Sequence, residues 1–584
     1  MQIPALNQSD LMIKLLHEKK SAREFQERKH EDWNENYELY RNKVRTNRLT
    51  QRQAVNIPMM KETIKTLLSK IDDPPMIDWE ELSGDEFKEL LMQEKWNAFY
   101  ENDNLEGIDV QDKKTALLAG RTFKKLNWVD DKVDLRALDI YDVVVDPMVD
   151  PLDLETAHFM LHQNIFRPLR NVLSDSRYSN EGKQKLKNYM TSKQGLIQSG
   201  ENKQEFDKKM ERLRAMGVDD HEFALFGMGD SLVNLTEHIS KIWNVRKQNY
   251  EKRVIVYADD QIELLNEPLL SMLGIDRYPY VTWGDDVETN DFWSDGPADL
   301  IRVPNKVSNI WFSQMIEGRT LNNFGMHWYA SGTNYTPQTY EPGPGRMLPS
   351  PPLQPGQSIK DVIMPVAIDR LDDNMTALQY LTQIVERGTA ATAIEKGVGE
   401  GGKQTLGEVE ILVGKAMERT VAMAKFYKRS WYNTATLWYE LTSANQRKKE
   451  TLYKTGADGK IWPKVVRPSE WKSEAGFRPI VRSSSEAESE KTKGMQKLIY
   501  IQSLFPNNPA VRRIMQSRAL EMVDVTPAEL REVEEAEKQM QQSVQQQMTM
   551  AQTDQMGQGA EAQPLQQVNE KVSELNQLQN APSI

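Results

Sequence analysis

A glycine-rich stretch is the first candidate for chemistry. Gly397 to Lys403 match the pattern G-x-x-x-x-G-K of a phosphate-binding loop. Such a loop next needs Ser or Thr to hold Mg²⁺, where this chain has Gln404, and it should follow a buried strand, whereas helical periodicity precedes it. Glu400 would also place a negative charge where phosphates bind. The stretch therefore lacks the context of a nucleotide site.

The alternative interpretation of this stretch is a mobile loop that meets a phosphate backbone. Glycine permits backbone movement, and lysine is a common phosphate contact. The residues that would act in this way are Lys396, Gly397, Gly399, Gly401, Gly402 and Lys403. A connector that makes no contacts at all is the simpler reading, and the sequence leaves both open.

Two other groups of residues have spacings that occur among metal ligands. His158 and His162 stand four apart, but their segment alternates like a strand and lacks the glutamate of an HExxH site. Four carboxylates follow one another nearby, at Asp142, Asp146, Asp150 and Asp153. They lack the order and the central glycine of a calcium-binding EF-hand loop, so we expect them to cap turns. The sequence predicts no metal and no cofactor.

Composition narrows the class of protein further. The chain has 584 residues, of which 39% are hydrophobic, so it can build several cores. It has no cysteine, which excludes disulfides and thiolate chemistry and fits assembly in a reducing cytoplasm. No run of 18 uncharged apolar residues predicts a membrane span. A net charge of −12 argues against a protein that coats nucleic acid, although not against local contacts.

The candidate loop belongs to a central alternation of helices and loops. Apolar spacing predicts a helix over residues 298–330, followed by a stretch dense in proline and glycine over 331–365. A second helix is expected over 369–387, then the glycine loop of 388–404 and a very long helix over 405–445. This plan suits a subunit that lends a stalk to a larger assembly better than it suits a catalytic pocket.

The central helices carry apolar stripes with two different expected roles. In the first helix the stripe includes Val303, Val307 and Ile310, and Pro304 should kink or restart it. The segment has few charges, so it is either a core helix or a helix packed between identical neighbours. In the long helix, Tyr427, Trp431, Ala435 and Trp438 are predicted to lie in the core.

Ahead of the central stretch, helical spacing predicts helices at 85–100 and 111–124. The acidic run between them, residues 101–109, is interpreted as a solvated loop. From 126 to 165 the period changes to two, which predicts strands around a turn at Asp130-Asp131.

Two more strands are expected at 232–245 and 253–265. The tail beyond 526 is rich in Gln, Met and Glu, and its apolar stripe is thin. A helix of that kind is marginal alone, so the tail is expected to be a helical bundle or partly disordered. The fold class expected from all these segments is α+β and predominantly helical.

The order of these pieces resembles the portal proteins of tailed bacteriophages of the podovirus and siphovirus type. The resemblance rests on the strand that ends at Asp146-Pro147, the helix with Glu317 to Asn322, and the proline-rich lobe with its flanking helices, glycine loop and long helix. It covers nearly the whole chain. Portal proteins form rings, usually of twelve identical subunits, and have no catalytic activity of their own.

The resemblance implies a role for each segment. Residues 1–297 would be the wing, 298–330 and 369–387 the two stem helices, 331–368 the clip, 388–404 the tunnel loop, 405–445 a long wing or channel helix, 446–525 the wing return and crown base, and 526–584 the crown tail. The clip residues that would dock the terminase or an adaptor are Tyr335, Tyr340, Arg346, Leu348, Leu353 and Lys360.

The implied function is a ring at one capsid vertex of the virion, assembled in the host cytoplasm, through which double-stranded DNA is packaged and ejected. Its implied partners are identical copies, the terminase large subunit, head–tail adaptors, and capsid and scaffolding proteins, with no membrane. Two alternatives remain. One is an ATP-dependent packaging enzyme of the terminase kind, suggested only by Gly397 to Lys403. The other is an adaptor or scaffold that conducts no DNA.

Overall fold

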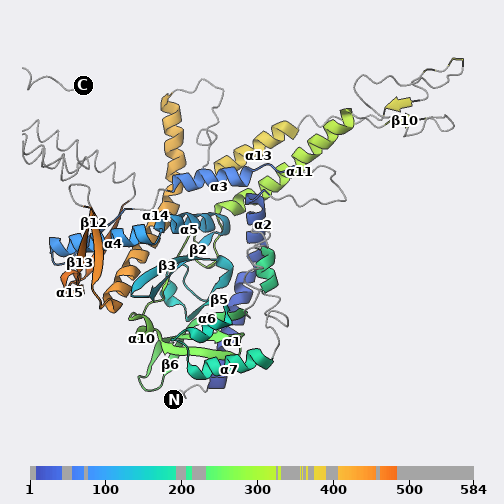
Figure 1. Ribbon diagram of the computed structural model, residues 1–584. Coiled ribbons are helices and arrows are strands. Elements are labelled where there is room, and N and C mark those ends of the chain that lie inside the picture. The colour runs from blue at the N-terminus through green and yellow to red at the C-terminus, as the bar shows by residue number, and fades with distance from the viewer. Residues whose placement is uncertain are drawn as a thin grey trace, which may run out of the picture. The chain divides into compact units, whose positions relative to one another are not determined.

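The computed structural model describes most of the first 482 residues. The described residues are 8–42, 55–71, 76–192, 206–212, 232–323, 327–329, 355–356, 358, 363–365, 374–389, 406–455 and 461–482. The chain divides into two compact units, one formed by residues 1–452 and 465–487 and the other by 453–464 and 488–584. The first unit holds nearly all of the described residues (Figure 1).

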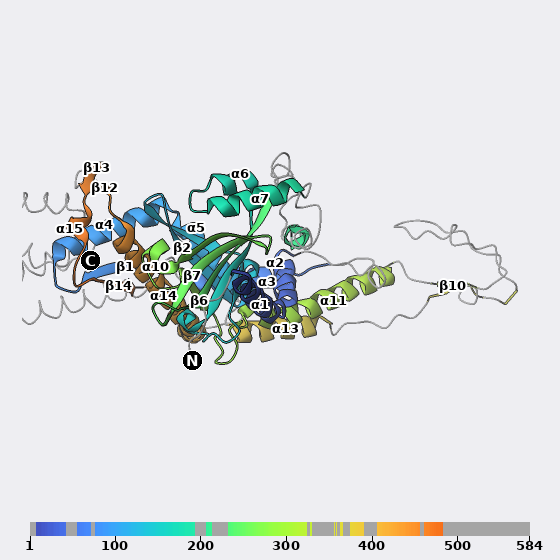
Figure 2. The same cartoon turned by 90° about the horizontal axis from the view of Figure 1, so that it is seen from below.

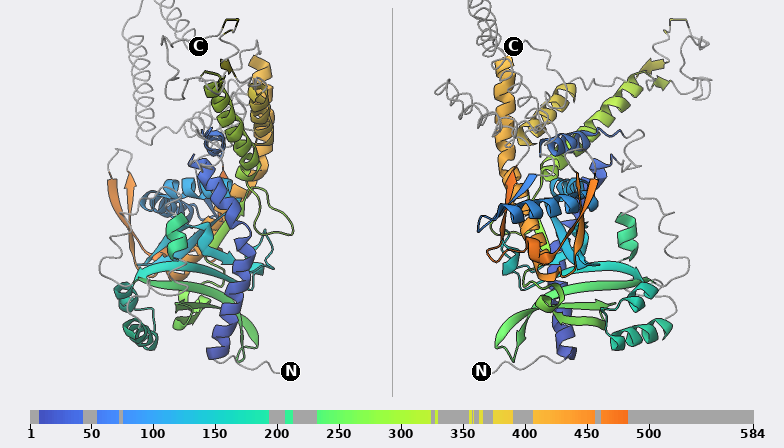
Figure 3. Two further views of the ribbon diagram at one scale, coloured as in Figure 1. Left: turned by 90° about the vertical axis from the view of Figure 1, so that its right-hand side faces the viewer. Right: turned by 60° about the vertical axis from the view of Figure 1, so that its left-hand side comes forward.

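The largest sheet has five antiparallel strands in the order β4-β5-β6-β7-β8. The strands are β4 (Val143–Val145), β5 (Phe159–Pro168), β6 (Leu232–Asn244), β7 (Asn249–Ala258) and β8 (Ile262–Pro268). Three helices pack against it: α6 (Leu169–Ser174), α7 (Asn180–Ser192) and α10 (Leu269–Leu273) (Figure 2). The helix α1 (Gln8–Glu27) runs across its strands (Figure 3).

A second, three-stranded sheet contributes side chains of all its strands to the main hydrophobic core. Its order is β3-β2-β9, with β2 (Arg121–Val129), β3 (Lys132–Leu138) and β9 (Tyr280–Gly284), all antiparallel. The predicted turn at Asp130 and Asp131 is confirmed, and both residues have positive φ, as a tight hairpin requires. The helices α5 (Leu105–Ala119) and α14 (Leu406–Asn445) pack against this sheet.

The remaining elements surround these two sheets or form small hairpins. The helices are α2 (His30–Tyr40), α3 (Met59–Lys70), α4 (Glu86–Asn102), α11 (Pro297–Asn323), α13 (Asn374–Thr389) and α15 (Pro468–Trp471), with short 3₁₀ turns at Ile140–Asp142 and Leu154–Thr156. The two-stranded sheets pair β1 (Met76–Glu81) with β14 (Phe477–Arg482), β10 (His327–Tyr329) with β11 (Ile363–Pro365), and β12 (Glu450–Thr455) with β13 (Ile461–Val466).

Several helix and strand boundaries differ from those predicted from the sequence. The fold is a mixture of helices and antiparallel sheets, with more strand than the expected predominantly helical class. Residues 121–124, predicted as helix, begin β2, because Gly120 ends α5 in the left-handed conformation. The predicted strand 253–265 is two strands, since Asp259 and Asp260 adopt positive φ and turn the chain.

The acidic run 101–109 is not a solvated loop. It spans the end of α4 and the start of α5, and Asp109 is fully buried. The strand expected around His162 is confirmed as β5, and the expected turn-capping role of the nearby aspartates is confirmed at Asp146, Asp150 and Asp153. Each of these three accepts a hydrogen bond from the backbone N–H two residues on.

One glycine ties the end of α5 to the loop before α11. Gly120 has φ +78°, and a Cβ added there would meet the Ser294 carbonyl oxygen at 2.0 Å. Gly84 has a similar φ, +83°, but open space around it. Gly84→Ala should therefore cost about 1–2 kcal/mol of unfolding free energy from backbone strain alone. Gly120→Ala should cost about 3 kcal/mol or more. Equal losses in urea denaturation would contradict this account of the close approach.

Candidate functional site

The helix pair α11 and α13 frames the insertion that the sequence singled out. The two helices pack against each other and lie side by side in Figure 1. Between them, β10 and β11 are antiparallel, with His327 opposite Pro365 and Tyr329 opposite Ile363. The chain therefore leaves α11 and returns toward α13 through two adjacent strands. Residues 327–329 were expected to continue the first helix; they form β10 because this aromatic run pairs with β11.

The first helix is also shorter at this end than expected, and it does not restart at Pro304. It ends at Asn323 and runs on through Pro304. The second helix begins in the described residues at Asn374, and the long third helix is confirmed at Leu406–Asn445.

The inner face of α11 begins with the apolar residues Ala298 and Ile301 and becomes polar from Asn305 onward. Asn305, Asn309 and Ser313 recur at one-turn spacing and bind residues 55–60, which comprise an irregular stretch and the first two residues of α3. The side chain of Asn305 accepts from the Met60 N–H at 2.8 Å, and that of Asn309 accepts from the Ile57 N–H at 2.8 Å. Ser313 Oγ accepts from the Val55 N–H at 3.1 Å. These bonds satisfy backbone groups that have no strand partner.

Asn305 is almost fully buried, and Ser308 on the same helix provides a matched control. Asn305→Ala would leave the Met60 N–H and the Ile57 carbonyl without their partner, and should lower the unfolding free energy by about 1–3 kcal/mol. Ser308 is equally buried, yet its hydroxyl has no partner among the described residues. Ser308→Ala should leave stability within about 0.5 kcal/mol of the parent. Thermal denaturation of both variants tests this contrast.

The outer face of α11 is apolar and exposed. Leu300, Val303, Val307 and Ile310 are spaced three, four and three residues apart, which is the repeat of a helix–helix seam. Leu300 is 62% exposed, Val303 61% and Ile310 46%. The helix therefore contacts its own subunit through Ala298, Ile301 and the polar row, and it turns a further apolar stripe away from the subunit. On α13, Tyr380 and Ile384 are likewise exposed one turn apart.

A buried network of charges anchors the long helix α14. Asp109 on α5 accepts from the Tyr427 hydroxyl at 2.7 Å and from Trp431 Nε1 at 3.0 Å, both on α14. Its other oxygen lies 2.6 Å from Lys113 Nζ. None of these four side chains is more than about a twentieth exposed. The predicted core positions Tyr427, Trp431, Ala435 and Trp438 are confirmed as buried.

A second carboxylate completes the network one turn along α5. Asp112 lies 2.8 Å from Lys124 Nζ and accepts from Trp283 Nε1 at 2.8 Å and from the Thr122 hydroxyl at 3.0 Å. The Lys124 ammonium also lies 4.5 Å from the centre of the Trp431 ring. The Asp112–Lys124 ion pair joins α5 to β2, and hydrogen bonds to the two aspartates add β9 and α14.

Burial sets the protonation of this network. Burial raises the pKa of Asp109, against the opposing effect of Lys113 and Tyr427. Burial, together with the neighbouring Asp109 carboxylate, raises the pKa of Tyr427, which keeps its hydroxyl a donor. The short contacts to Lys113 and Tyr427 show an acceptor that is fully used. The network therefore anchors α14 to α5 and β2.

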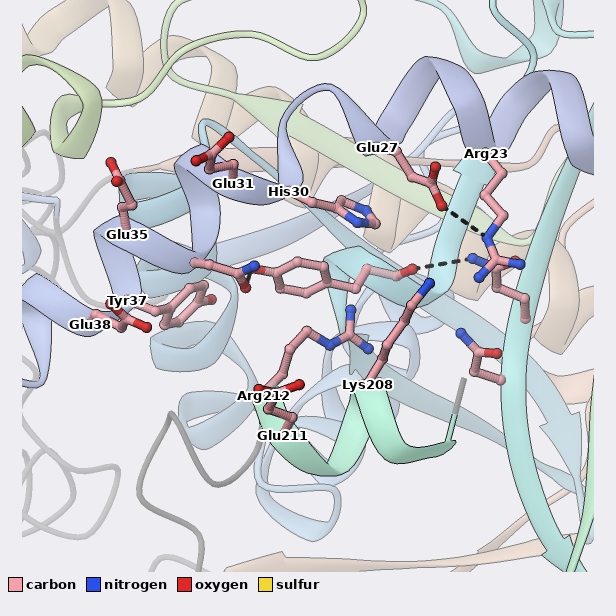
Figure 4. Close-up of a pocket in the computed structure, with 14 residues that line it drawn as sticks. Arg23, Glu27, His30, Glu31, Glu35, Tyr37, Glu38, Lys208, Glu211 and Arg212 are labelled. Atoms are coloured by element: carbon pink, nitrogen blue, oxygen red, sulfur yellow. Dashed lines mark hydrogen bonds and ion pairs between the residues drawn. The ribbon is translucent and has the colours of Figure 1, made fainter. Parts of the chain in front are cut away.

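An open cavity of about 620 Å³ lies beside the first two helices (Figure 4). Glutamates of α1 and α2 line one side, and Lys208, Glu211 and Arg212 line the other. The Arg212 guanidinium lies 4.1 Å from the centre of the Tyr141 ring. Beneath it, burial raises the pKa of Asp142 to about 6, although Lys209 and Arg212 are close to the carboxylate. Acidic and basic side chains both line the cavity, and their arrangement does not point to a particular reaction.

Neither a metal centre nor a membrane span emerges from the part of the chain that the structure describes. No group of three or more His, Asp or Glu side chains there is arranged to hold a metal ion. No described helix is both long enough and apolar enough to cross a membrane.

The predicted loop and clip residues lie outside the described residues. These are Lys396, Gly397, Gly399, Gly401, Gly402 and Lys403 in the loop, and Tyr335, Tyr340, Arg346, Leu348, Leu353 and Lys360 in the insertion. The structure locates the elements on either side of them: α13 ends at Thr389, α14 begins at Leu406, and β10 and β11 flank the insertion.

Sequence reasoning missed two sets of residues. The first is the polar row on α11, whose signal was Asn305, Asn309 and Ser313 at one-turn spacing within an otherwise apolar helix. The second is the carboxylate pair Asp109 and Asp112, for which the local sequence gave no signal, because their partners lie on β2, β9 and α14.

Comparison with known proteins gives no family assignment. No protein-family model matches the chain, and no curated protein matches it. Among solved structures, one described as the neck of an empty GTA particle computed with C6 symmetry aligns at 9% identity, with a TM-score of 0.36. Another, described as the virion of a native gene transfer agent (GTA) particle, aligns at 10% identity and 0.33. Each alignment covers 79% of this chain and 90% of the other, and similarity this weak does not establish a shared fold.

Proposed function

We propose that the chain is the subunit of a tailed-phage portal ring, which packages and ejects double-stranded DNA at one capsid vertex. The proposal rests on the two sides of the helix α11. Polar side chains of α11 bind its own subunit, whereas the apolar stripe of Leu300, Val303 and Ile310 is exposed. An exposed stripe of this kind needs a partner helix or surface. An identical copy supplies that partner for every subunit when the copies close into a ring.

On this proposal the described elements take the roles that the resemblance implies. The helices α11 and α13 are the stem, and the insertion that β10 and β11 begin and end is the clip, where the terminase and head–tail adaptors dock. The sheets and their helices form the wing, and residues 388–404 are assigned as the tunnel loop. The buried charges of α5 and β2 anchor α14, the helix that follows this loop in the sequence. A net charge of −12 suits a channel in which DNA must slide.

The competing interpretation is an ATP-dependent packaging enzyme. A phosphate-binding loop of that type connects a buried strand to a helix. Among the described residues, the element that precedes Gly397 is the helix α13, which ends at Thr389. This context supports a structural loop over a nucleotide site. Measurable ATP binding that is lost in Lys403→Ala would overturn the portal proposal in favour of the enzyme.

Electron microscopy of the purified full-length protein, with native mass spectrometry, tests the ring directly. The expected result is a closed ring of identical subunits, usually twelve in portals, with a central hole wide enough for a DNA duplex. Monomers at micromolar concentration would contradict the proposal. A closed ring without a hole would point instead to an adaptor or scaffold that conducts no DNA.

A further inference from the structure

The strands β6 and β7 extend beyond the other strands of the five-stranded sheet. β5 pairs with β6 only as far as Ser240, and β8 pairs with β7 only from Arg253 onward. β6 and β7 continue to pair with each other as far as Asn244 and Asn249. Residues 241–252 therefore form a two-stranded ribbon, which we call the arm. Among the described residues, neither edge of the arm has a further strand beside it.

The two faces of the arm have different surroundings, because successive side chains of a strand point to opposite faces. Ile242 packs against the cluster that Leu11 and Leu15 of α1 form with β7. Trp243 and Tyr250 are cross-strand partners on the other face, with ring centres 5.2 Å apart and the rings edge to face. Tyr250 is 61% exposed. The helix α1 thus supports one face, while the Tyr250 ring remains in solvent on the other.

The turn at the tip of the arm is fixed by its own hydrogen bonds. The side-chain oxygen of Asn244 accepts from the N–H groups of Arg246 at 3.0 Å and Lys247 at 3.2 Å. Gln248 Nε2 donates to the Val245 carbonyl at 2.8 Å. The side chains of Arg246 and Lys247 are exposed. A partner that binds the tip therefore meets a backbone that is already ordered, which lowers the entropic cost of binding.

The arm is basic, although the chain as a whole carries a net charge of −12. Its twelve residues include four cations and one carboxylate, namely Lys241, Arg246, Lys247, Lys252 and Glu251. At the base of the arm, Lys252 pairs with Glu155 at 2.5 Å. At the tip, Lys247 lies 3.6 Å from Glu251, and no carboxylate among the described residues pairs with Arg246. The uncompensated positive charge is therefore at the exposed tip.

We propose that the arm binds the phosphate backbone of double-stranded DNA, through residues other than those of the proposed tunnel loop. Arg246, Lys247 and the Tyr250 hydroxyl all offer hydrogen-bond donors, and phosphate oxygens only accept. The four residues from Lys241 to Val245 span about 13 Å in a strand. A two-stranded ribbon fits the major groove of B-DNA, which is about 12 Å wide and has phosphates along both rims.

The acidic remainder of the chain does not prevent this contact. The tip lies about 13 Å from the base of the arm, and the screening length in physiological salt is about 8 Å. A duplex at the tip therefore meets mainly the charges of the arm itself. The contact is independent of the proposed portal role, because it needs neither a closed ring nor a channel.

Binding of a closed circular duplex to the full-length protein tests the proposal. Such a circle cannot thread a closed ring, so it reports contacts made outside a channel. In filter binding, Arg246→Gln with Lys247→Gln should lose at least about tenfold in affinity at about 50 mM salt. The slope of log affinity against log salt should become shallower by about 1.8 for each bound subunit, because two phosphate contacts are lost. Tyr250→Phe should lose about two- to tenfold without a change in slope, because its hydroxyl is neutral.

Lys185→Gln with Lys187→Gln on α7 is the matched control. Both lysines are exposed, and Lys185 pairs with Glu181 four residues away, as Lys247 pairs with Glu251. This variant removes the same charge and should bind the circle as the parent does. No binding by the parent, or equal losses in the two double variants, would overturn the proposal. An arm variant that binds the circle normally but fails to assemble in sedimentation velocity would also overturn it, and would show that the arm contacts another subunit.

Discussion

Asp112→Ala should lower the free energy of unfolding by about 3–5 kcal/mol, because it leaves a buried ammonium without its counter-ion. Lys124 is fully buried, and Asp112 lies 2.8 Å from it. The same substitution removes the acceptor for Trp283 and Thr122. Urea denaturation followed by tryptophan fluorescence measures the loss, and the Trp283 environment should change with it.

An exposed ion pair supplies the control. Lys132 lies 3.4 Å from Asp103, but its side chain is 66% exposed. Lys132→Met should therefore change stability by no more than about 1 kcal/mol. The double variant Asp112→Leu with Lys124→Met removes both buried charges and should recover part of the loss. A loss in the double variant as large as in Asp112→Ala would show that the hydrogen bonds, and not the unpaired charge, account for the effect.

Ile310→Asp should abolish or strongly weaken subunit assembly while leaving the fold intact. Ile310 is 46% exposed in the single subunit, so the aspartate would be solvated there. In an assembly that buries the α11 seam, the same carboxylate would be desolvated without a partner, at a cost of several kcal/mol, or about a thousandfold or more in association. Sedimentation velocity reports the assembly state, and circular dichroism reports the fold.

Met148→Asp is the matched control for this prediction. Met148 is 86% exposed on the turn after β4, and Met148→Asp likewise replaces an exposed apolar side chain with a carboxylate. It should assemble as the parent does. If both variants assemble normally, the α11 seam is not the interface; if both fail, the defect is not specific to α11.

The elements predicted best are those whose pattern is local and long. The forty-residue helix α14 and the helix, insertion and helix around β10 and β11 follow from apolar spacing and from proline and glycine density. The β2–β3 hairpin follows from period-two alternation around two aspartates. In these segments the residues that determine the structure are neighbours in the sequence.

The errors arose where a distant partner decides the role of a residue. Asp109 lies in a run of charges that local rules assign to solvent, yet Tyr427 and Trp431, over three hundred residues later, make it a core residue. Likewise Asn305 and Asn309 look like interruptions of an apolar helix until residues 55–60 are placed beside them. For the loop and insertion residues, the roles assigned from the sequence remain predictions.

The short pairing of β10 with β11 has a consequence for how such a protein can diversify. The two ends of the intervening segment are fixed next to each other, with Tyr329 opposite Ile363. Doubling the length of a flexible segment closed in this way costs only about 0.6 kcal/mol, since the entropy of closure grows with the logarithm of length. The closing strands and the helices on either side can therefore accept a segment of different length or sequence, and if the segment is the proposed clip, its docking partners could change without any change in those helices.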